Sequence, residues 1–344
     1  MRREIRFVFV ILSALLLAFS CTPKKYTESF DAMNTFMTIQ AYGSNAEEAL
    51  AEAKGRVEAI ENAISTTKRN SDIYKLNHAS GASCAVRGDT AFLFEFTHGM
   101  YKATDMALNP ALYPVISAWG FTTGTYRVPA AQEIEELLSN TDFLQAELTN
   151  TEAGAEIRVA KGMELDFGAV GKGYAGDEII RIFKEHDVKY ALLDLGGNVQ
   201  ALGTKTDGSK WTVGIKNPWG GDPVCTVKIA DCAVVTSGGY ERFFTDDDGK
   251  RYIHIFDPKT GYPVENDLES VTIVCQKGLY ADALSTSLFV MGKDKAIDWW
   301  SQNGGFDFIL ITKDEELFYS SGIKDDVKIL YPFKAAYAVA QSAE

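Results

Sequence analysis

The chain is short of the residues on which many metal and redox sites depend. Its 344 residues include only four histidines and five cysteines, and no two cysteines are spaced as C-x-x-C. No spacing of histidine and cysteine matches a zinc site. Positive charge is also scarce, because 34 Lys and Arg stand against 47 Asp and Glu, which leaves a net charge of −13. That deficit argues against nucleic acid or an anionic membrane surface as a partner.

The N-terminal apolar run is too short to span a membrane. It covers residues 7–19 and follows three arginines, whereas a span needs about 20 apolar residues. A basic start before such a run predicts a secretory signal peptide over residues 1–20. The run ends in Leu-Ala-Phe-Ser-Cys, which resembles a bacterial lipobox. We therefore expect a lipidated Cys21, a tether over residues 21–29, and an extracytoplasmic, periplasmic-side protein anchored to a bacterial membrane. An ordinary signal peptide with an incidental cysteine is the alternative.

Four further cysteines, at positions 84, 225, 232 and 275, allow three complete pairings, and the sequence does not choose among them. Cys225 and Cys232 flank a possible hairpin over residues 226–231, which makes them the favoured pair. Free buried thiols are equally compatible with the sequence.

Apolar periodicity predicts an α+β fold, because helices and strands do not alternate regularly. From residue 163 onward, strands dominate. At this length we expect a mixed sheet and helices arranged in two lobes, with the active site in the cleft between them, and residues 30–335 as one catalytic domain. The predicted helices cover 47–64, 90–104, 131–139, 173–184, 282–291 and 294–301, and a last hairpin joins 306–312 to 317–320.

The segment from Leu279 to Leu288 carries a possible metal site. Positions i and i+4 share one face of a helix, so Asp282 and Thr286 present a carboxylate and a hydroxyl side by side. Such an all-oxygen pair suits a hard cation such as Mg²⁺. The alternative is an acid favoured by the helix dipole beside a Thr that bonds its own backbone.

A glycine-rich segment, Leu165–Ala175, offers a possible phosphate site. An apolar strand ends at Asp166, glycines follow, and a helix begins after them. Glycines let backbone N–H groups approach an anion, and Lys172 adds a point charge. The spacing matches neither a Walker A loop nor G-x-G-x-x-G. A tight turn with a solvated lysine is about equally compatible.

Two other segments add candidates. Residues 192–199 predict a strand that turns at Gly-Gly-Asn and resumes, which is typical of a hairpin. Residues 235–263 predict strand, acidic turn, strand, and a tight turn at Asp-Pro-Lys-Thr-Gly. His254 stands just before that tight turn and is a candidate general base, although a lone strand histidine is often a structural hydrogen-bonding residue.

In their order, these segments resemble the ApbE family of flavin transferases, which attach FMN from FAD to a threonine of a target protein. The resemblance covers roughly residues 30 to 330. The matching segments are 31–37, 64–66, 71–77, 107–110, 118–121, 166–177, 194–198, 236–238, 254–261 and 281–291.

The resemblance implies roles for the phosphate and metal residues. Asp282, Thr286 and the backbone carbonyl of Ala169 match Mg²⁺ ligands. Asp166 and Lys172 match positions that contact FAD. His254 matches the histidine that activates the acceptor hydroxyl, so that His254 and Asp282 are the expected catalytic residues.

It also implies a lining for the flavin or adenine. The matching positions are Met33, Thr67, Ala107, Leu108, Asn109 and Phe256. Three residues depart from the family pattern. Asn34 stands where Gly is usual, Asn109 where Asp is usual, and Thr67 where many members carry an aromatic residue.

The implied activity is Mg²⁺-dependent transfer of FMN from FAD to an acceptor threonine, with release of AMP. The expected acceptors are redox-pump subunits or extracytoplasmic flavoproteins. Two alternatives remain at this stage. One is an FAD pyrophosphatase that releases FMN and AMP, and the other is a lipid-anchored flavin-binding protein without chemistry.

Overall fold

The computed structural model describes residues 23–152 and 154–341. The predicted signal peptide and Cys21 lie outside the described residues. The first strand, β1 (Lys25–Ala32), begins within the segment expected to be a tether. None of the described helices is long and apolar enough to cross a membrane.

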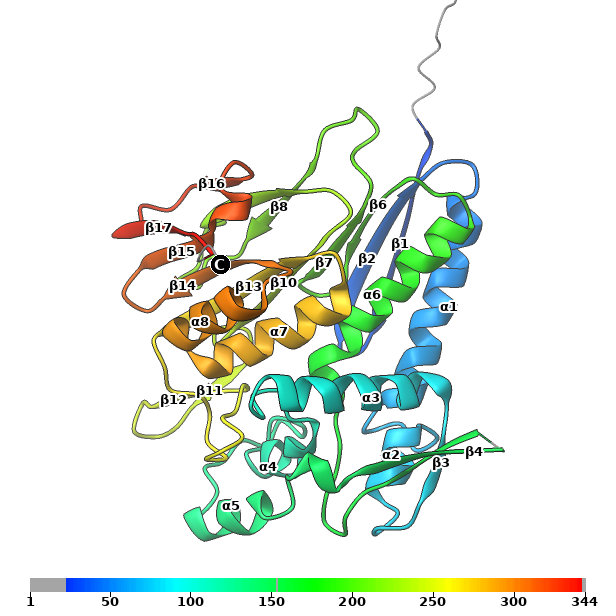
Figure 1. Ribbon diagram of the computed structural model, residues 1–344, viewed down its shortest axis with the longest axis vertical. Helices are drawn as coiled ribbons and strands as arrows, with labels where there is room; N and C mark the ends of the chain where they lie inside the picture. Colours follow the sequence, from blue (N-terminus) through cyan, green and yellow to red (C-terminus); the bar gives the residue numbers. More distant parts are fainter. Residues whose placement is uncertain (1–22, 153, 342–344) are drawn as a thin grey trace, which may run out of the picture.

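A nine-stranded mixed sheet forms the centre of the upper part of the molecule in Figure 1, in the order β1-β2-β6-β7-β10-β13-β14-β15-β17. Its neighbouring strands pair antiparallel, except that β15 and β17 are parallel. After β1, the strands are β2 (Thr35–Tyr42), β6 (Tyr190–Asp194), β7 (Asn198–Leu202), β10 (Ala233–Gly238), β13 (Leu268–Cys275), β14 (Asp307–Thr312), β15 (Glu316–Ser320) and β17 (Ala335–Val339).

Each face of this sheet packs against a different layer. Val235 and Ile273 belong to the core shared with the helices α1 (Ala46–Ile64), α6 (Gly168–Glu185), α7 (Gly278–Met291) and α8 (Lys293–Asn303). Val234 and Val274, one residue along each strand, pack instead with a small sheet of β8 (Trp211–Ile215), β9 (Cys225–Ile229) and β16 (Val327–Ile329). This alternation follows from the two-residue period of a strand.

The lower part in Figure 1 holds the shorter elements. A third core gathers around Trp119 and Phe256, against the hairpin of β11 (Phe243–Thr245) and β12 (Arg251–Ile253). The other elements here are α2 (Asp72–Asn77), α3 (Gly88–Ala103), α4 (Tyr113–Ala118), α5 (Ala131–Leu138), the sheet of β3 (Cys84–Val86), β4 (Glu147–Thr151) and β5 (Gly154–Arg158), and the single 3₁₀ turns Pro110–Leu112, Phe143–Gln145 and, in the upper part, Ser321–Ile323.

The predicted α+β class, the hairpins at 190–202 and 307–320, and most of the predicted helices are confirmed within about two residues at most boundaries. Two helices begin a full turn or more before their predicted starts, α6 at Gly168 and α7 at Gly278. The glycine-rich segment is not a loop, because α6 begins at Gly168 and contains Gly171 and Gly173. Gly173 is needed for packing, since a Cβ there would lie 2.2 Å from the carbonyl oxygen of Gly278 on α7.

The favoured cysteine pair is also wrong. Cys84, Cys225, Cys232 and Cys275 are all free thiols in the described structure. Cys225 lies on β9 of the small sheet, whereas Cys232 directly precedes β10 of the large sheet. The chain between them passes from one sheet to the other instead of forming the expected hairpin.

Candidate active site

A cavity of about 800 Å³ lies where the helical layer of the large sheet meets the lower part of the molecule. Its wall brings together segments from residue 33 to residue 286. Every predicted catalytic, cofactor and metal residue that the structure describes lines it: Met33, Thr67, Ala107, Leu108, Asn109, Asp166, Ala169, Lys172, His254, Phe256, Asp282 and Thr286.

The Asp282 carboxylate is held at the crossing of α6 and α7. Its Oδ2 accepts a 2.8 Å hydrogen bond from the backbone N–H of Gly173, and only 5% of the residue is exposed. Burial raises the pKa of Asp282, although Lys172 and the Gly173 amide oppose that shift. The Asn198 amide acts on the Asp282 carboxylate in the same direction as these two groups, and both residues line the cavity.

Two further oxygens accompany Asp282. The Thr286 hydroxyl lies 3.2 Å from the hydroxyl of Ser237 on β10. The second oxygen is the backbone carbonyl of Ala169. In a regular helix this carbonyl accepts the Gly173 N–H, but here that N–H bonds Asp282. A carboxylate, a hydroxyl and a carbonyl fit Mg²⁺, which uses few protein ligands and shares its shell with substrate phosphates. The described chain has no cluster of three or more His, Cys, Asp or Glu suited to another metal.

Three cationic residues line the same cavity: Lys172 on α6, Arg242 before β11, and Lys216, which pairs with Glu241. Arg242 Nη2 donates a 2.6 Å hydrogen bond to the Phe121 carbonyl, which ties the segment before β11 to the turn after α4. The sequence reasoning missed Arg242, because an isolated arginine beside a strand carries no recognisable motif.

Asp166 caps the start of α6 by accepting a 2.8 Å hydrogen bond from the Gly168 N–H. Burial raises its pKa, whereas Gly168, Lys172 and Arg242 act in the opposite direction. The structure therefore gives Asp166 a capping role, and its contact with FAD stays a prediction.

His254 follows β12 and is half-buried in the cavity wall. Its Nδ1 lies 3.1 Å from the Arg242 carbonyl oxygen. Because a carbonyl only accepts, Nδ1 carries the proton and Nε2 is left with a lone pair. Burial, followed by the charge of Arg242, lowers the pKa of His254 to about 4. The imidazole is therefore neutral at pH 7 and is able to accept a proton.

The opposite side of the cavity is built from turns. Met33 and Asn34 have φ values of 50° and 58°, the left-handed pair of a two-residue hairpin turn between β1 and β2. Asparagine tolerates this conformation, so the departure from glycine at position 34 does not disturb the turn. The Met33 N–H bonds Glu61 of α1 at 3.0 Å and fixes the turn.

Asn109 shows why a second departure is tolerated. Its Oδ1 accepts a 2.9 Å bond from the Ala111 N–H, and its Nδ2 donates a 3.0 Å bond to the Thr141 carbonyl. Both ends of the amide therefore stabilise the loop. Ala107, Leu108 and Phe256 are nearly fully buried beside it, whereas Thr67 is exposed at the rim.

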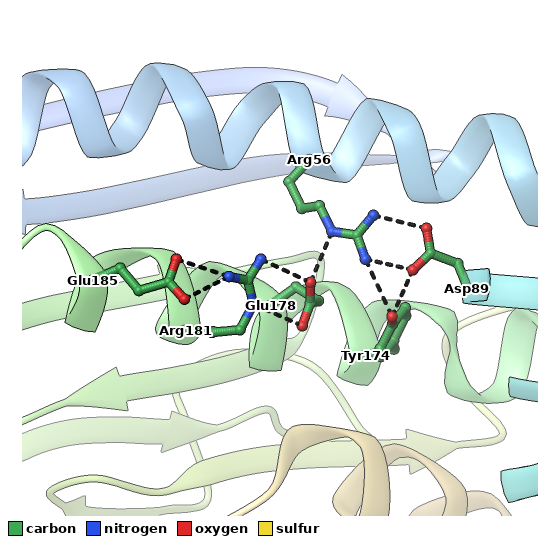
Figure 2. Close-up of polar contacts among 6 residues, drawn as sticks. All are labelled: Arg56, Asp89, Tyr174, Glu178, Arg181 and Glu185. Atoms are coloured by element: carbon green, nitrogen blue, oxygen red, sulfur yellow. Dashed lines mark hydrogen bonds and ion pairs between the residues drawn. The ribbon is translucent and has the colours of Figure 1, made fainter. Parts of the chain in front are cut away.

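An ion-pair network anchors α6 to the rest of the molecule (Figure 2). Arg56 of α1 bonds Asp89 of α3 and, at 2.8 Å, Glu178 of α6. The Tyr174 hydroxyl donates a 2.6 Å bond to Asp89. Tyr174 follows Gly173 directly, so this network holds the turn of α6 that faces Asp282.

The sequence of this chain is similar to those of known proteins. The model of the ApbE family matches residues 33–310. An FAD:protein FMN transferase of Treponema pallidum is 33% identical over 89% of this chain and 90% of its own length. One from Klebsiella pneumoniae is 33% identical over 77% and 82% of the two chains.

Solved structures agree with the fold. The ApbE protein of Thermotoga maritima superposes with a TM-score of 0.78 at 31% identity, covering 84% of this chain and 95% of that one. The flavinyl transferase ApbE of Pseudomonas stutzeri gives 0.75 at 28% identity, covering 85% and 92%. The extent of the family match and these identities show that the chain belongs to the ApbE family.

Proposed function

We propose that the protein transfers FMN from FAD to a threonine hydroxyl of an acceptor protein and releases AMP, with Mg²⁺ as cofactor. One observation carries this proposal: a single cavity is lined by an oxygen pair for a cation, by the cationic side chains of Lys172 and Arg242, and by a neutral histidine. The relatives from Treponema pallidum and Klebsiella pneumoniae are named FAD:protein FMN transferases, which supports the transfer of FMN from FAD to a protein.

The residues divide the chemistry between them. Asp282, Thr286 and the Ala169 carbonyl would hold Mg²⁺, which, when bound, supplies charge neutralisation to the pyrophosphate. Lys172 and Arg242 attract and orient the phosphates. The amides of Gly168–Gly173 take a smaller part than we expected from the sequence, because the glycines lie within α6 and the Gly173 N–H is engaged with Asp282.

His254 Nε2 takes the proton from the threonine hydroxyl. The threonine Oγ forms a bond to the FMN phosphorus, and the bond from that phosphorus to the oxygen of AMP breaks. With a pKa of about 4, the imidazole is a weak base in the free enzyme. The negative charge of bound FAD raises this pKa towards the range in which a general base is effective.

The experiment that tests the proposal is incubation with FAD, Mg²⁺ and a candidate acceptor, followed by intact-mass analysis. We expect AMP and FMN-modified acceptor in equal amounts. Rapid release of free FMN and AMP with an unmodified acceptor supports the pyrophosphatase alternative instead. Binding of FAD with no turnover supports the non-catalytic alternative.

We also propose that the protein is lipid-anchored through Cys21 on the outer side of a bacterial membrane, where redox-pump subunits or extracytoplasmic flavoproteins serve as acceptors. The support is the sequence from residue 1 to residue 21. Cys21→Ser should release the protein from the membrane fraction or leave its signal peptide uncleaved. Unchanged membrane partitioning of the processed variant contradicts this assignment.

A further inference from the structure

Two buried amides on β7 lie directly behind Asp282. Asn198 and Gln200 are separated by two positions, so their side chains leave the same face of the strand. They are 0% and 2% exposed. Gln200 Nε2 donates to the Gly173 carbonyl at 3.2 Å and to Asn198 Oδ1 at 3.3 Å. Gln200 therefore connects the α6 turn that holds Asp282 with the Asn198 side chain.

Glycines on two helices make room for the Gln200 amide. A Cβ at Gly176 of α6 would lie 2.0 Å from Gln200 Nε2, and one at Gly278 of α7 would lie 1.7 Å from it. Such distances are far inside van der Waals contact, so neither position accepts a larger residue while Gln200 keeps its place. The close fit on both sides restricts Gln200 to one orientation.

The orientation of Asn198 follows from that of Gln200. The Asn198 Oδ1 faces the Gln200 donor, so the Asn198 Nδ2 points the opposite way. On that side lies the wall of the cavity, which Asn198 and Asp282 both line. Within the described structure this Nδ2 is buried and has no hydrogen-bond partner. A buried N–H without a partner is costly, so a nearby acceptor is expected to take it. The Asp282 carboxylate, on which the Asn198 side chain acts and which lines the same cavity, is the acceptor that would satisfy it.

We propose that Gln200 and Asn198 are positioning residues for the metal site. Gln200 holds both Gly173 and Asn198, and these two groups together hold the Asp282 carboxylate in one orientation towards the cavity. This inference rests on the proposed Mg²⁺ site. It assigns a role to Gln200, a residue that does not line the cavity and would contact neither the metal nor FAD.

The test measures the affinity for Mn²⁺ in the presence of FAD and without acceptor, by electron paramagnetic resonance of free Mn²⁺. Gln200→Met keeps a side chain of similar size but removes both donors, and Asn198→Leu removes the amide at nearly constant volume. We expect either change to weaken Mn²⁺ binding 10–100-fold, as loss of an outer-shell partner does in other metal sites. Thermal melts show whether each variant is folded, and either variant alone suffices for the test.

Ser320→Ala is the matched control. Ser320 is also fully buried in the large sheet, and its hydroxyl bonds Asp307 at 2.6 Å and the Phe308 N–H at 3.1 Å. This change removes buried hydrogen bonds far along the sheet order from β7 and should leave Mn²⁺ affinity unchanged. Gln200→Met combined with Asp282→Asn should bind Mn²⁺ no more weakly than Asp282→Asn alone, because the oriented group is already lost.

The outcomes separate the two proposals. If Asp282→Asn weakens Mn²⁺ binding but the two amide variants match Ser320→Ala, the positioning role is overturned and the metal site stands. If Gln200→Met weakens binding equally in the wild-type and the Asp282→Asn backgrounds, Gln200 acts through general packing and the inference is again overturned. If Asp282→Asn binds Mn²⁺ like the wild type, the metal site itself is wrong and the positioning role falls with it.

Discussion

The two sides of the cavity are built in different ways. On the phosphate side, Lys172, Asp282 and Thr286 stand on long helices, and Asp282 is fixed by a backbone N–H from the neighbouring helix. On the side expected to hold the flavin, Met33 and Asn34 lie in a hairpin turn and Asn109 precedes a single 3₁₀ turn. The proposed metal ligands and Lys172 are therefore placed by helices, whereas Arg242, His254 and the surface expected to hold the flavin are placed by loops and turns.

The difference bears on the departures from the family pattern that the sequence resemblance implies. Asn34, Asn109 and Thr67, the three expected departures, all lie on the loop side. A phosphoryl transfer depends on groups held within a fraction of an ångström. An aromatic ring instead accepts many apolar surroundings, so loop residues are free to vary. The predictions below test this contrast, from the largest expected effect to the smallest.

Asp282→Ala should have the largest effect, a loss of about 10⁴-fold in transfer rate, because the developing charge on the pyrophosphate loses its counter-ion. Thr286→Ala should cost only about tenfold, since water replaces a neutral hydroxyl ligand. The measurement is initial rate at saturating FAD and Mg²⁺. Wild-type turnover in both variants would remove the basis for the metal site.

His254→Ala should lower transfer about 10³-fold, within the range of general base catalysis. FAD binding should persist, because His254 donates nothing to the phosphates in the proposed mechanism. Slow release of AMP without acceptor should persist as well, since water reaches the phosphorus without a docked protein. An equal loss of hydrolysis and transfer contradicts the assignment of His254 to the acceptor hydroxyl.

The pH profile examines the same residue in the intact enzyme. The pKa of His254 is lowered to about 4, well below the value of about 6.5 for a free histidine. The base form of His254 therefore persists as the pH falls to 5. The kcat/KM for FAD, which reports the free enzyme, should decline only near pH 4. A decline centred near pH 6.5, as for a solvent-exposed imidazole, contradicts the buried environment of His254.

How far the sequence predicts this molecule differs between the two sides. The i, i+4 spacing of Asp282 and Thr286 predicts their shared face, because helical geometry is local. For the α6 glycines the sequence predicts a turn, because the contacts that require glycine there are tertiary. Gly173 accommodates α7, and Gly176 accommodates Gln200. Arg242 and the Asn198–Gln200 pair carry no local motif, since only the fold brings Arg242 to the cavity and Gln200 to the α6 turn.

The Arg56 network should matter more for stability than for chemistry. Arg56→Met leaves Asp89 without its main partner and leaves Glu178 with Arg181 alone. Both carboxylates are mostly buried, with side-chain exposures of 16% and 17%. We expect the free energy of unfolding to fall by about 2 kcal/mol at pH 7, between the values for exposed and fully buried ion pairs. Urea denaturation measures it, with the exposed pair variant Arg158→Met as a control expected to change little.

The same network predicts a pH dependence. Burial works to raise the pKa values of Asp89 and Glu178. Hydrogen bonds from Arg56 and Tyr174 to Asp89, and from Arg181 and Arg56 to Glu178, outweigh burial and hold both pKa values below their ordinary range. A carboxyl whose pKa is lowered in the folded state adds stability in full above its unfolded-state pKa, about 3.9 for Asp and 4.3 for Glu. This stability is lost as the pH falls through the folded-state pKa. Wild type and Arg56→Met should therefore converge in stability below about pH 4. A constant difference between pH 7 and pH 3 contradicts the ion-pair origin.

Asn109→Asp should have the smallest effect and concerns the loop side alone. The variant restores the residue usual in the family but removes the Nδ2 donor to the Thr141 carbonyl, so that an acidic oxygen faces an oxygen. The bond from the Ala111 N–H to the other oxygen is kept. We expect a loss of about 1 kcal/mol, or roughly 2 °C in Tm for a chain of this length, and a change in KM for FAD of less than about threefold. Calorimetry and steady-state kinetics on one preparation separate the two quantities. A large rise in KM with unchanged Tm would mean that the Asn109 amide contacts FAD directly, and that the loop side is as tightly specified as the phosphate side.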